Sequence, residues 1–499
     1  MWHIRVNVMG YKKITIYIIL IFLAIVVLFL LTCIDRDQSQ SPVSGSEEST
    51  ADAVNSDIME NAKQETNTSH ITNDRMVVYI NWDGFAWYYY ECANKGELAG
   101  TPVMNSLIKE GVLFSDTCTG IPSITNPMQT SILTGAWPSV TGNCYQYFDR
   151  HSSKILKTGR ENRAENLAEA ITRQGFRAAS IHQFILENRG TFAASKENPY
   201  VQLGNNADYA ARFDEAINFV KSMKVYSPAA SINENIMPAF LAIYMDDLDG
   251  IGHNSWFTYG VPPVKSESER LESILKRLKL MDAKLGVFIQ ACREAGIYDK
   301  VSFLLTSDHG MTPYGIQNGL DDGCGYSKLP DLVNALQSMD YKTEVLSEGK
   351  GPKKDTDIVL APTGLQVQLF FTGQDDKPDV DRITAALTKK EYIGVVMSKT
   401  ELIRRGSADE FADMLISPKP PYSFKNDKKL HKAGGQHDSL DESSQHVFAL
   451  MWGSGIKKGF AYDEKIYVID FAKTISSLLG IDSPKDSTGR LLEGALEGF

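Results

Sequence analysis

The sequence lacks several features that would assign it to familiar classes. Its net charge is -11 at pH 7 and its pI lies near 5.4. Nucleic-acid-binding proteins usually carry a basic patch, so we expect no nucleic-acid polymer as a partner. None of its six cysteines forms a Cys-x-x-Cys pair, which argues against a zinc knuckle or a dithiol site. Beyond residue 75 there is no internal repeat and no low-complexity tract.

The amino terminus carries the long apolar run. Arg5, Lys12 and Lys13 precede an uninterrupted apolar stretch over residues 14–33, and Asp35 follows it. About 20 apolar residues span a bilayer. Basic residues before the run place the N-terminus in the cytoplasm. We therefore predict a cytoplasmic tail (1–13), a single transmembrane signal anchor (14–34) and a catalytic part outside the cytoplasm, held at the cell membrane.

A cleaved signal is the alternative for this run. The run is longer than a usual signal-peptide core and has no A-x-A-like cleavage site, which favours an uncleaved anchor. Lipoprotein processing at Cys33 is a second alternative, although the residue before it is Thr32 and not a small apolar one. Residues 35–75 are rich in Ser, Asp, Glu, Asn and Thr, a composition typical of a disordered stalk.

The remainder, residues 76–499, alternates short apolar runs with amphipathic segments. The predicted strands are Met76–Ile80, Arg177–Ile181, Phe240–Met245, Val301–Thr306 and Val447–Trp452. The predicted helices include Arg163–Arg173 and Leu271–Ala295. This alternation predicts an α/β fold with a largely parallel sheet buried on both faces. Ligands of such folds bind beyond the carboxyl ends of the strands.

Three of these strands lead directly into acidic residues or histidines. A further histidine, His437, lies in a glycine-rich loop before the strand at 447. The candidate ligands are Asp83, Asp249, His253, Asp308, His309 and His437. Taken singly, each Asp reads as a turn residue or helix cap and each His as a surface or core residue. Their joint position at strand ends predicts two divalent ions, with Asp and His favouring zinc and manganese as the alternative.

The candidate nucleophile is Thr125. It lies in a loop that enters a short helix, where Thr125 or Asn126 could be the N-cap, Pro127 fits the first turn and Gly135 fits the end. A hydroxyl at a helix N-terminus meets backbone N–H groups that favour a phosphoryl group. The simpler interpretation is that Thr125 only caps the helix, because a threonine hydroxyl is a poor nucleophile until a base or metal activates it.

These motifs, in this order, resemble the alkaline phosphatase superfamily. The best resemblance is to its type I phosphodiesterase and nucleotide pyrophosphatase group, while Pro122–Pro127 looks like the nucleophile segment of phosphonoacetate hydrolase. The resemblance implies an alkaline phosphatase-like three-layer sandwich, matched over residues 76–459. The stretch 312–430 matches loosely, and we take it as an inserted cap with a strand at Leu365–Phe371.

The resemblance also implies residue roles. One metal would be held by Asp249, His253 and His437. The other would be held by Asp83, Asp308, His309 and the Thr125 oxygen. The reaction would be in-line cleavage of a phosphodiester, pyrophosphate or phosphonate bond in a small phosphorylated or phosphonate substrate, through a covalent phosphothreonine that water hydrolyses.

The sequence departs from the group near the nucleophile. Met128 stands where the phosphodiesterases usually carry Asn, and a second expected Asn falls near Tyr145 and Gln146. We assign Gln146, with its neighbour Asn143, as candidate substrate-binding amides. The aromatic cluster at 87–90 reads as core packing, or as a surface that stacks on a planar group.

Five other functions compete with the hydrolase. A sulfatase would need a Cys-x-Pro-x-Arg or Ser-x-Pro-x-Arg motif, which is absent around Thr125. A cytoplasmic phosphosugar mutase does not fit the signal anchor. An envelope phosphotransferase or a phosphatase of the same superfamily would use the same Thr and metals. A non-catalytic surface binding protein would be free to lose a ligand, and none is missing. Oligomeric state is not predicted.

Overall fold

The computed structural model describes residues 75–498 except 96–99, 205, 223, 228–229, 234–236, 318–325, 374–377 and 426–431. The predicted tail, the anchor at 14–34 and the stalk as far as residue 74 lie outside the described part. Within that part, no helix has both the length and the apolar character that a bilayer span requires.

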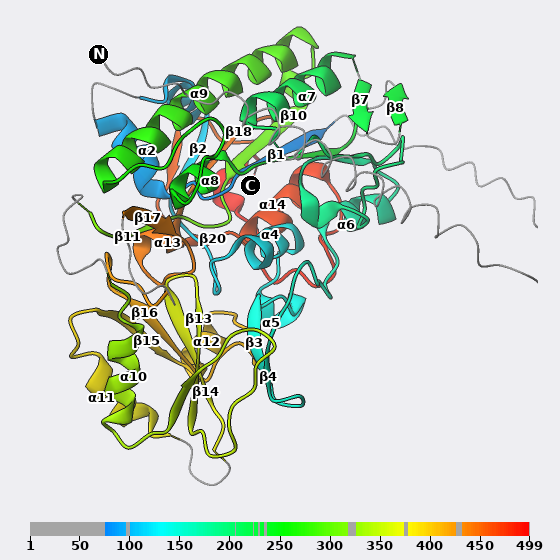
Figure 1. The fold of residues 1–499 in the computed structure, drawn as a ribbon. Helices are drawn as coiled ribbons and strands as arrows, with labels where there is room; N and C mark the ends of the chain where they lie inside the picture. Colours follow the sequence, from blue (N-terminus) through cyan, green and yellow to red (C-terminus); the bar gives the residue numbers. More distant parts are fainter. Residues whose placement is uncertain are drawn as a thin grey trace, which may run out of the picture. The chain divides into compact units, whose positions relative to one another are not determined.

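The described residues build a nine-stranded central sheet (Figure 1). From one edge to the other its strands are β19 (Phe460–Tyr462), β2 (Gly111–Cys118), β18 (His446–Gly453), β10 (Val301–Thr306), β1 (Met76–Trp82), β9 (Phe240–Met245), β5 (Ala178–Ile181) and β6 (Tyr200–Val201), with β20 (Ile466–Tyr467) beside β2. The pairs within β10-β1-β9-β5-β6 are parallel, and β18 alone runs antiparallel to its neighbours. The largely parallel sheet is therefore confirmed.

Strands β1, β9 and β10 are buried along their whole length. They are rich in Val, Ile, Leu, Phe and Tyr, the composition of strands covered on both faces of a parallel sheet. Strands β9 and β10 have the bounds predicted from sequence, and β1 continues two residues further, to Trp82. These three central strands set the position of the site at their carboxyl ends.

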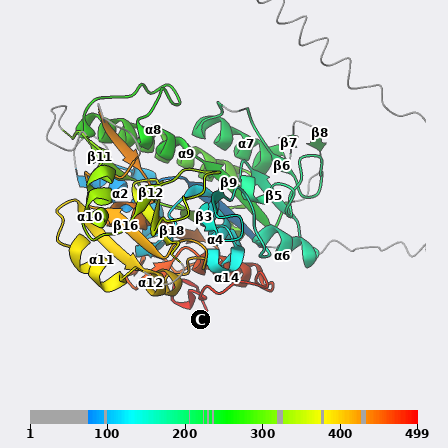
Figure 2. The same ribbon diagram turned by 60° about the horizontal axis from the view of Figure 1, so that its bottom comes forward.

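Helices cover both faces of the central sheet, which gives three layers (Figures 1 and 2). One hydrophobic core lies between the sheet and α2 (Trp87–Lys95), α3 (Pro102–Lys109), α7 (Tyr209–Ser222), α8 (Asp247–His253) and α9 (Glu267–Glu294). The opposite core contains α4 (Thr125–Thr134), α6 (Leu167–Arg173) and α14 (Asp470–Leu479). The cluster at 87–90 forms the start of α2 and packs on the first core, as the core-packing interpretation expected.

A second, five-stranded sheet has its own hydrophobic core and falls within the stretch that we took as an inserted cap. Its strands in spatial order are β12 (Thr343–Val345), β13 (Ile358–Thr363), β14 (Gln366–Phe371), β16 (Met414–Pro418) and β15 (Ile393–Ser398). Helices α10 (Leu329–Gln337) and α11 (Val380–Leu387) pack on one face. The other face meets α12 (Lys399–Arg404) and the hairpin β3 (Gln146–Asp149) and β4 (Lys154–Lys157), which comes from outside residues 312–430.

Short elements connect these units. They are α5 (Pro138–Thr141), α13 (Glu442–Gln445), the antiparallel pair β11 (Thr312–Gly315) and β17 (Ala433–Gln436), the hairpin β7 (Lys224–Ser227) and β8 (Ala230–Asn233), and the 3-10 turns η1 (Phe184–Leu186), η2 (Tyr298–Lys300) and η3 (Glu493–Ala495). The pair β11–β17 matters for function because it ends one residue before His437.

Candidate active site

Three neighbouring strands end level with one another and bring five acidic or imidazole groups to one edge of the sheet. In the register of the ladders, Asn81 pairs with Thr306 and Trp82 pairs with Met245. The residues that follow therefore leave the sheet side by side. They are Asp83 after β1, Asp249 and His253 on α8 after β9, and Asp308 and His309 after β10.

The first group of ligand atoms comes from Asp83, Asp308 and His309. The Nε2 atom of His309 lies 3.3 Å from Asp83 Oδ1 and 3.6 Å from Asp308 Oδ2. All three side chains are buried. Their candidate ligand atoms lie within 4.8 Å of one another, which is close enough for one divalent ion to contact all three.

The second group comes from Asp249, His309 and His437, whose ligand atoms also lie within 4.8 Å of one another. His253 joins it through Asp249, because its Nε2 atom lies 3.3 Å from Asp249 Oδ1. Asp249 and His253 stand four residues apart on α8, so they share one helix face. The structure thus brings together all six candidate ligands, with His309 between the two groups.

His437 reaches the site by a different route from the one expected. We predicted a glycine-rich loop around it, but the residues before it form strand β17, paired with β11. Glycines at 434 and 435 suggested a loop, yet a side chain on Gly435 would meet Gly252 O at 2.3 Å. The glycine therefore allows β17 to pack closely on α8, and the His437 ring lies 4.0 Å from the His309 ring between centroids.

Backbone carbonyls orient two of the imidazoles. His253 Nδ1 donates to Gly435 O at 3.0 Å, and His309 Nδ1 donates to Gly310 O at 3.0 Å. A proton on Nδ1 leaves a lone pair on Nε2, and in both residues Nε2 is the atom that faces the carboxylates. This is the arrangement by which proteins hold a histidine ready to bind a metal.

Thr125 lies next to the first group. Its Oγ1 atom is 3.1 Å from His309 Nε2. Helix α4 begins at Thr125 and its N-cap is Ile124, in an extended conformation and without a side-chain cap bond. The expectation that Thr125 or Asn126 is the N-cap was therefore wrong. Because the Thr125 hydroxyl does not cap the helix, it is free to face the site. Gly135 ends the helix in the left-handed conformation, as predicted.

Burial controls the electrostatics of the cluster. Burial raises the pKa of Asp83 well above its usual value, and the charges of Asp308 and Asp249 raise it further. Burial also raises the pKa of Asp308, an effect that His309 partly offsets. Asp83 Oδ1, Asp249 Oδ1 and Asp308 Oδ2 are buried beside histidine Nε2 atoms and have no hydrogen-bond partner. Buried carboxylate oxygens of this kind need a cation, and the donor set fits one.

The amides of Gln146 and Asn143 bond to groups other than the candidate ligands. Gln146 Nε2 donates to Gln368 Oε1 at 3.0 Å, and Asn143 Nδ2 donates to Gly159 O at 3.1 Å. Both side chains are buried. Among the residues that the structure describes, no hydrogen bond joins either amide to Thr125 or to the candidate ligands, so the substrate-binding role remains a prediction.

Two further residues shape the site and were not singled out in the sequence. The Tyr244 hydroxyl donates to Asp83 Oδ2, and the Thr119 hydroxyl donates to the Asp308 carbonyl. Tyr244 reads as an ordinary residue of a buried strand, and only the pairing of β9 with β1 shows its target. No local motif marks either residue.

Comparison with known proteins decides the family. The family model described as type I phosphodiesterase / nucleotide pyrophosphatase matches residues 77–439, which is most of the chain. The chain belongs to this family. The phosphodiesterase and nucleotide pyrophosphatase resemblance predicted from the motifs is thereby confirmed.

Curated members of the family are distant relatives. The chain is 24% identical over 292 residues to bis(5'-adenosyl)-triphosphatase ENPP4 of Pongo abelii, covering 57% of this chain and 59% of that protein. It is 23% identical to the Homo sapiens protein of the same name, with the same coverages. It is 19% identical to ectonucleotide pyrophosphatase/phosphodiesterase family member 7 of Rattus norvegicus, and that match covers 52% of this chain and 54% of that protein. The chain thus spans little more than half the length of these relatives.

Solved structures of the phosphodiesterase family share the fold. Human ectonucleotide pyrophosphatase / phosphodiesterase 5 superposes with a TM-score of 0.56 at 16% identity, covering 85% of this chain and all of that chain. The murine protein superposes with a TM-score of 0.54 at 17% identity, covering 82% of this chain and 96% of that chain. An inactive variant of the murine protein, with the same score, is in complex with AMP. At these identities the likeness establishes the α/β fold.

Proposed function

We propose that this protein is a metal-dependent hydrolase that cleaves a phosphodiester, pyrophosphate or phosphonate bond through a covalent phosphothreonine on Thr125. The observation that carries the proposal is the 3.1 Å separation of Thr125 Oγ1 and His309 Nε2, at the point where the two candidate ligand groups share His309. A bare N-cap threonine would instead bond to its own helix, and Thr125 does not.

Two divalent ions fit the residues present. Asp249, His253 and His437 would hold one, and Asp83, Asp308, His309 and Thr125 Oγ1 the other. The mixture of imidazole and carboxylate ligands suits zinc, and manganese is the alternative. When bound, a pair of such ions lowers the pKa of a coordinated hydroxyl and neutralises charge on phosphoryl oxygens.

The protein's own groups then perform the displacement. Thr125 Oγ1 forms a bond to phosphorus as the bond from phosphorus to the leaving atom breaks, and the hydroxyl proton passes to solvent. Water next attacks the phosphothreonine on the opposite side, which releases the phosphoryl product and restores the hydroxyl. The N-terminus of α4, where Thr125 is the first residue, presents backbone N–H groups and the positive end of the helix dipole to the phosphoryl oxygens.

Nucleotide-type substrates are proposed from the relatives. The curated ENPP4 proteins are named for hydrolysis of a bis(5'-adenosyl) triphosphate, and the murine structural neighbour holds AMP. The resemblance of Pro122–Pro127 to phosphonoacetate hydrolase supports a phosphonate as the alternative. The basic residues before the apolar run at 14–33 support a single-pass membrane anchor with the catalytic part outside the cytoplasm.

The test uses chelated full-length protein to which zinc or manganese is returned. Bis(p-nitrophenyl) phosphate, p-nitrophenyl phosphate and p-nitrophenyl sulfate are compared as substrates. We expect metal-dependent cleavage of the diester, a loss of at least about 100-fold in kcat for Thr125→Ala, and partial activity for Thr125→Ser because it keeps a hydroxyl.

Acid quenching during turnover should leave a phosphoryl group on the peptide that contains Thr125, detected by mass spectrometry. Preference for the monoester would indicate a phosphatase. Full diester activity in Thr125→Ala, with metal bound, would overturn the proposed nucleophile.

A further inference from the structure

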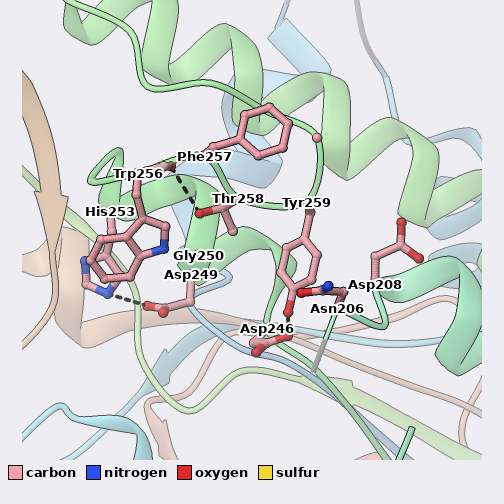
Figure 3. Close-up of a pocket in the computed structure, with 11 residues that line it drawn as sticks. Asn206, Asp208, Asp246, Asp249, Gly250, His253, Trp256, Phe257, Thr258 and Tyr259 are labelled. Carbon is pink, nitrogen blue, oxygen red and sulfur yellow. Dashed lines mark hydrogen bonds and ion pairs between the residues drawn. The ribbon is translucent and has the colours of Figure 1, made fainter. Parts of the chain in front are cut away.

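Two imidazoles of one ligand group, His253 and His437, come from different elements and need support from outside the group. A cavity of about 700 Å³ adjoins His253, and Figure 3 shows its ion pair with Asp249 there. Acidic and aromatic side chains line this cavity, among them Asp208, Asp246, Asp249, Trp256 and Phe257. The carbonyl that accepts from the His253 ring, Gly435 O, is not part of the lining. The support for these ligands is therefore found on the buried side of the site.

Arg270 of α9 lies on that buried side, and its side chain is fully buried. Its Nη1 group donates at 2.9 Å to the carbonyl of Gly252, the residue before His253. On the other segment, a Cβ built on Gly435 would lie 2.6 Å from Arg270 Nη1 and 2.3 Å from Gly252 O. One guanidinium thus lies directly against the backbone of both segments that carry the two imidazoles.

The guanidinium of Arg270 is fixed in its plane because each of its five N–H donors has an acceptor. Glu267 accepts from Nε and from Nη2, both at 2.6 Å. Nη2 also donates to the Tyr88 hydroxyl and Nη1 to the Tyr89 hydroxyl, each at 3.3 Å. Gly252 O takes the fifth donor. A lysine has three donors on one freely rotating nitrogen and cannot reproduce this planar fork.

The charge of Arg270 is balanced where it stands. A lone guanidinium at this position would repel a divalent cation held by His253. Glu267 forms a two-point ion pair with it, and the Glu267 side chain keeps 20% of its surface exposed to solvent. The pair therefore directs N–H groups at the Gly252 carbonyl without adding net positive charge beside the proposed ion.

Tyr88 extends these contacts to a third segment. Its hydroxyl donates at 3.0 Å to the carbonyl of Met311, two residues after His309. The Met311 side chain packs on both glycines, since a Cβ on Gly252 would lie 3.0 Å from its Cε and a Cβ on Gly435 2.7 Å from its Cγ. Part of the aromatic cluster at 87–90 thus has a polar role at the site in addition to core packing.

The ligand group of Asp83 and Asp308 has supports of its own. The Tyr244 hydroxyl donates to the Asp83 carboxylate, and the Thr119 hydroxyl donates to the Asp308 carbonyl. Neither bond involves Arg270. A displaced guanidinium is therefore expected to disturb one ligand group and to leave the other in place.

We propose that Arg270 is a positioning residue that holds His253 and His437 at the separation one divalent ion requires, and so sets the affinity of that ion alone. The proposal rests on the two-ion site of the proposed function. Groups that orient metal ligands in this way typically contribute tenfold to 100-fold in metal affinity.

Zinc titration of the chelated full-length protein against a chromophoric chelator tests the proposal, because it resolves two affinities. His253→Ala and Asp83→Asn assign each affinity to its ligand group. Arg270→Lys keeps the charge and loses the fork. We expect it to lower the affinity of the His253 ion by about tenfold or more and that of the other ion by less than about threefold. With cobalt in place of zinc, the visible absorption of the His253 site alone should shift.

A second variant keeps the test decisive if Arg270→Lys does not fold. Tyr88→Phe removes only a hydroxyl, and we expect the same selective loss of affinity, by about threefold. Asp282→Asn is the matched control. Asp282 is another buried charge of α9, but it accepts from the backbone N–H groups of Val103 and Met104 at 3.0 Å and 2.8 Å. This substitution should lower Tm and change neither zinc affinity.

The outcomes separate the positioning role from the proposed function. Equal falls in the two affinities, or no fall, in any folded variant of Arg270 or Tyr88 would overturn the positioning role. The same selective loss in Asp282→Asn would overturn it as well, because general destabilisation of α9 would then be the cause. Failure of the unsubstituted protein to bind two zinc ions would instead overturn the proposed function.

Discussion

At the scale of single residues, the site depends on a glycine that no ligand motif includes. Gly84 follows Asp83 and has φ +73°, in the left-handed region. A Cβ built on it would lie 2.9 Å from the Asp249 Cα. The loop after β1 can approach α8 this closely only because residue 84 has no side chain. The separation of Asp83 and Asp249, and with it the spacing of the two ligand groups, is set here.

Gly84→Ala is expected to destabilise the protein by about 1–3 kcal/mol and to weaken metal binding, because the strained turn must move away from α8. Thermal unfolding and a zinc titration of chelated protein measure the two effects. Gly349→Ala is the matched control: Gly349 has φ +77° but nothing within 4 Å of the added Cβ, so it isolates the backbone strain. Equal losses in the two variants would show that the contact with Asp249 is unimportant.

At the scale of elements, one short segment joins three parts of the structure. Asp438 follows His437, its backbone N–H donates to Ser123 O at 3.0 Å, and its side chain accepts from Gln366 Nε2 at the start of β14. Ser123 lies in the loop that leads to Thr125. The β17 strand, the nucleophile loop and the second sheet are therefore connected through a single residue, Asp438, whose buried carboxyl gives the inserted region a structural role at the site as well as a position beside it.

That carboxyl predicts a pH dependence of stability. Burial raises the pKa of Asp438 to about 8 from 3.8. The folded protein then binds a proton that the unfolded chain releases above about pH 4, so stability from this group is lost as pH rises toward 8, with a slope of at most about 1.4 kcal/mol per pH unit. In zinc-loaded protein, Asp438→Asn should flatten the fall in urea-unfolding free energy between pH 5 and pH 8. An unchanged slope would contradict the assignment of a bound proton to Asp438 in the folded protein.

At the scale of the whole molecule, the cation is expected to hold together elements that come from across the chain. The ligands follow β1, β9, β10 and β17, and the raised pKa values of Asp83 and Asp308 mean that without metal these buried carboxyls hold their protons to a higher pH than exposed carboxyls do. Metal binding must displace those protons, so metal affinity rises with pH. In chelated protein, the contribution of these two carboxyls to the stability of the folded state is lost as pH rises above about 4.

Chelation is therefore expected to lower Tm, more strongly at pH 8 than at pH 6, and zinc should restore it. Calorimetric titration of chelated protein with zinc in two buffers of different ionisation enthalpy counts the protons released. Asp83→Asn should reduce that number, whereas Asp331→Asn, on the exposed surface of α10, should not. Metal uptake without proton release would contradict the assigned protonation of the cluster.

Many of the strands and most of the candidate ligands could be predicted from the amino-acid sequence. The runs at 240–245 and 301–306 became strands with the predicted bounds because continuous β-branched and aliphatic runs suit only a doubly covered parallel sheet. Five of the six candidate ligands could be predicted because parallel strands end at one edge, whereas His437 follows β17, outside the central sheet. The conformation before His437 was mispredicted, since glycines that permit close packing look the same in sequence as glycines that form a loop. The N-cap of α4 was mispredicted because a hydroxyl's hydrogen-bond partner is not local.

The sequence by itself determined the α/β class and the family, and it supplied the candidate ligand and nucleophile residues, because these depend on local periodicity and on motifs of fixed order. Only the tertiary structure decided that the amides of Gln146 and Asn143 bond to Gln368 and Gly159, that Tyr244 supports Asp83, and that an acidic, aromatic cavity adjoins Asp249 and His253. Those facts depend on strand register and on loops that meet from distant parts of the chain, and neither is recorded in any local pattern.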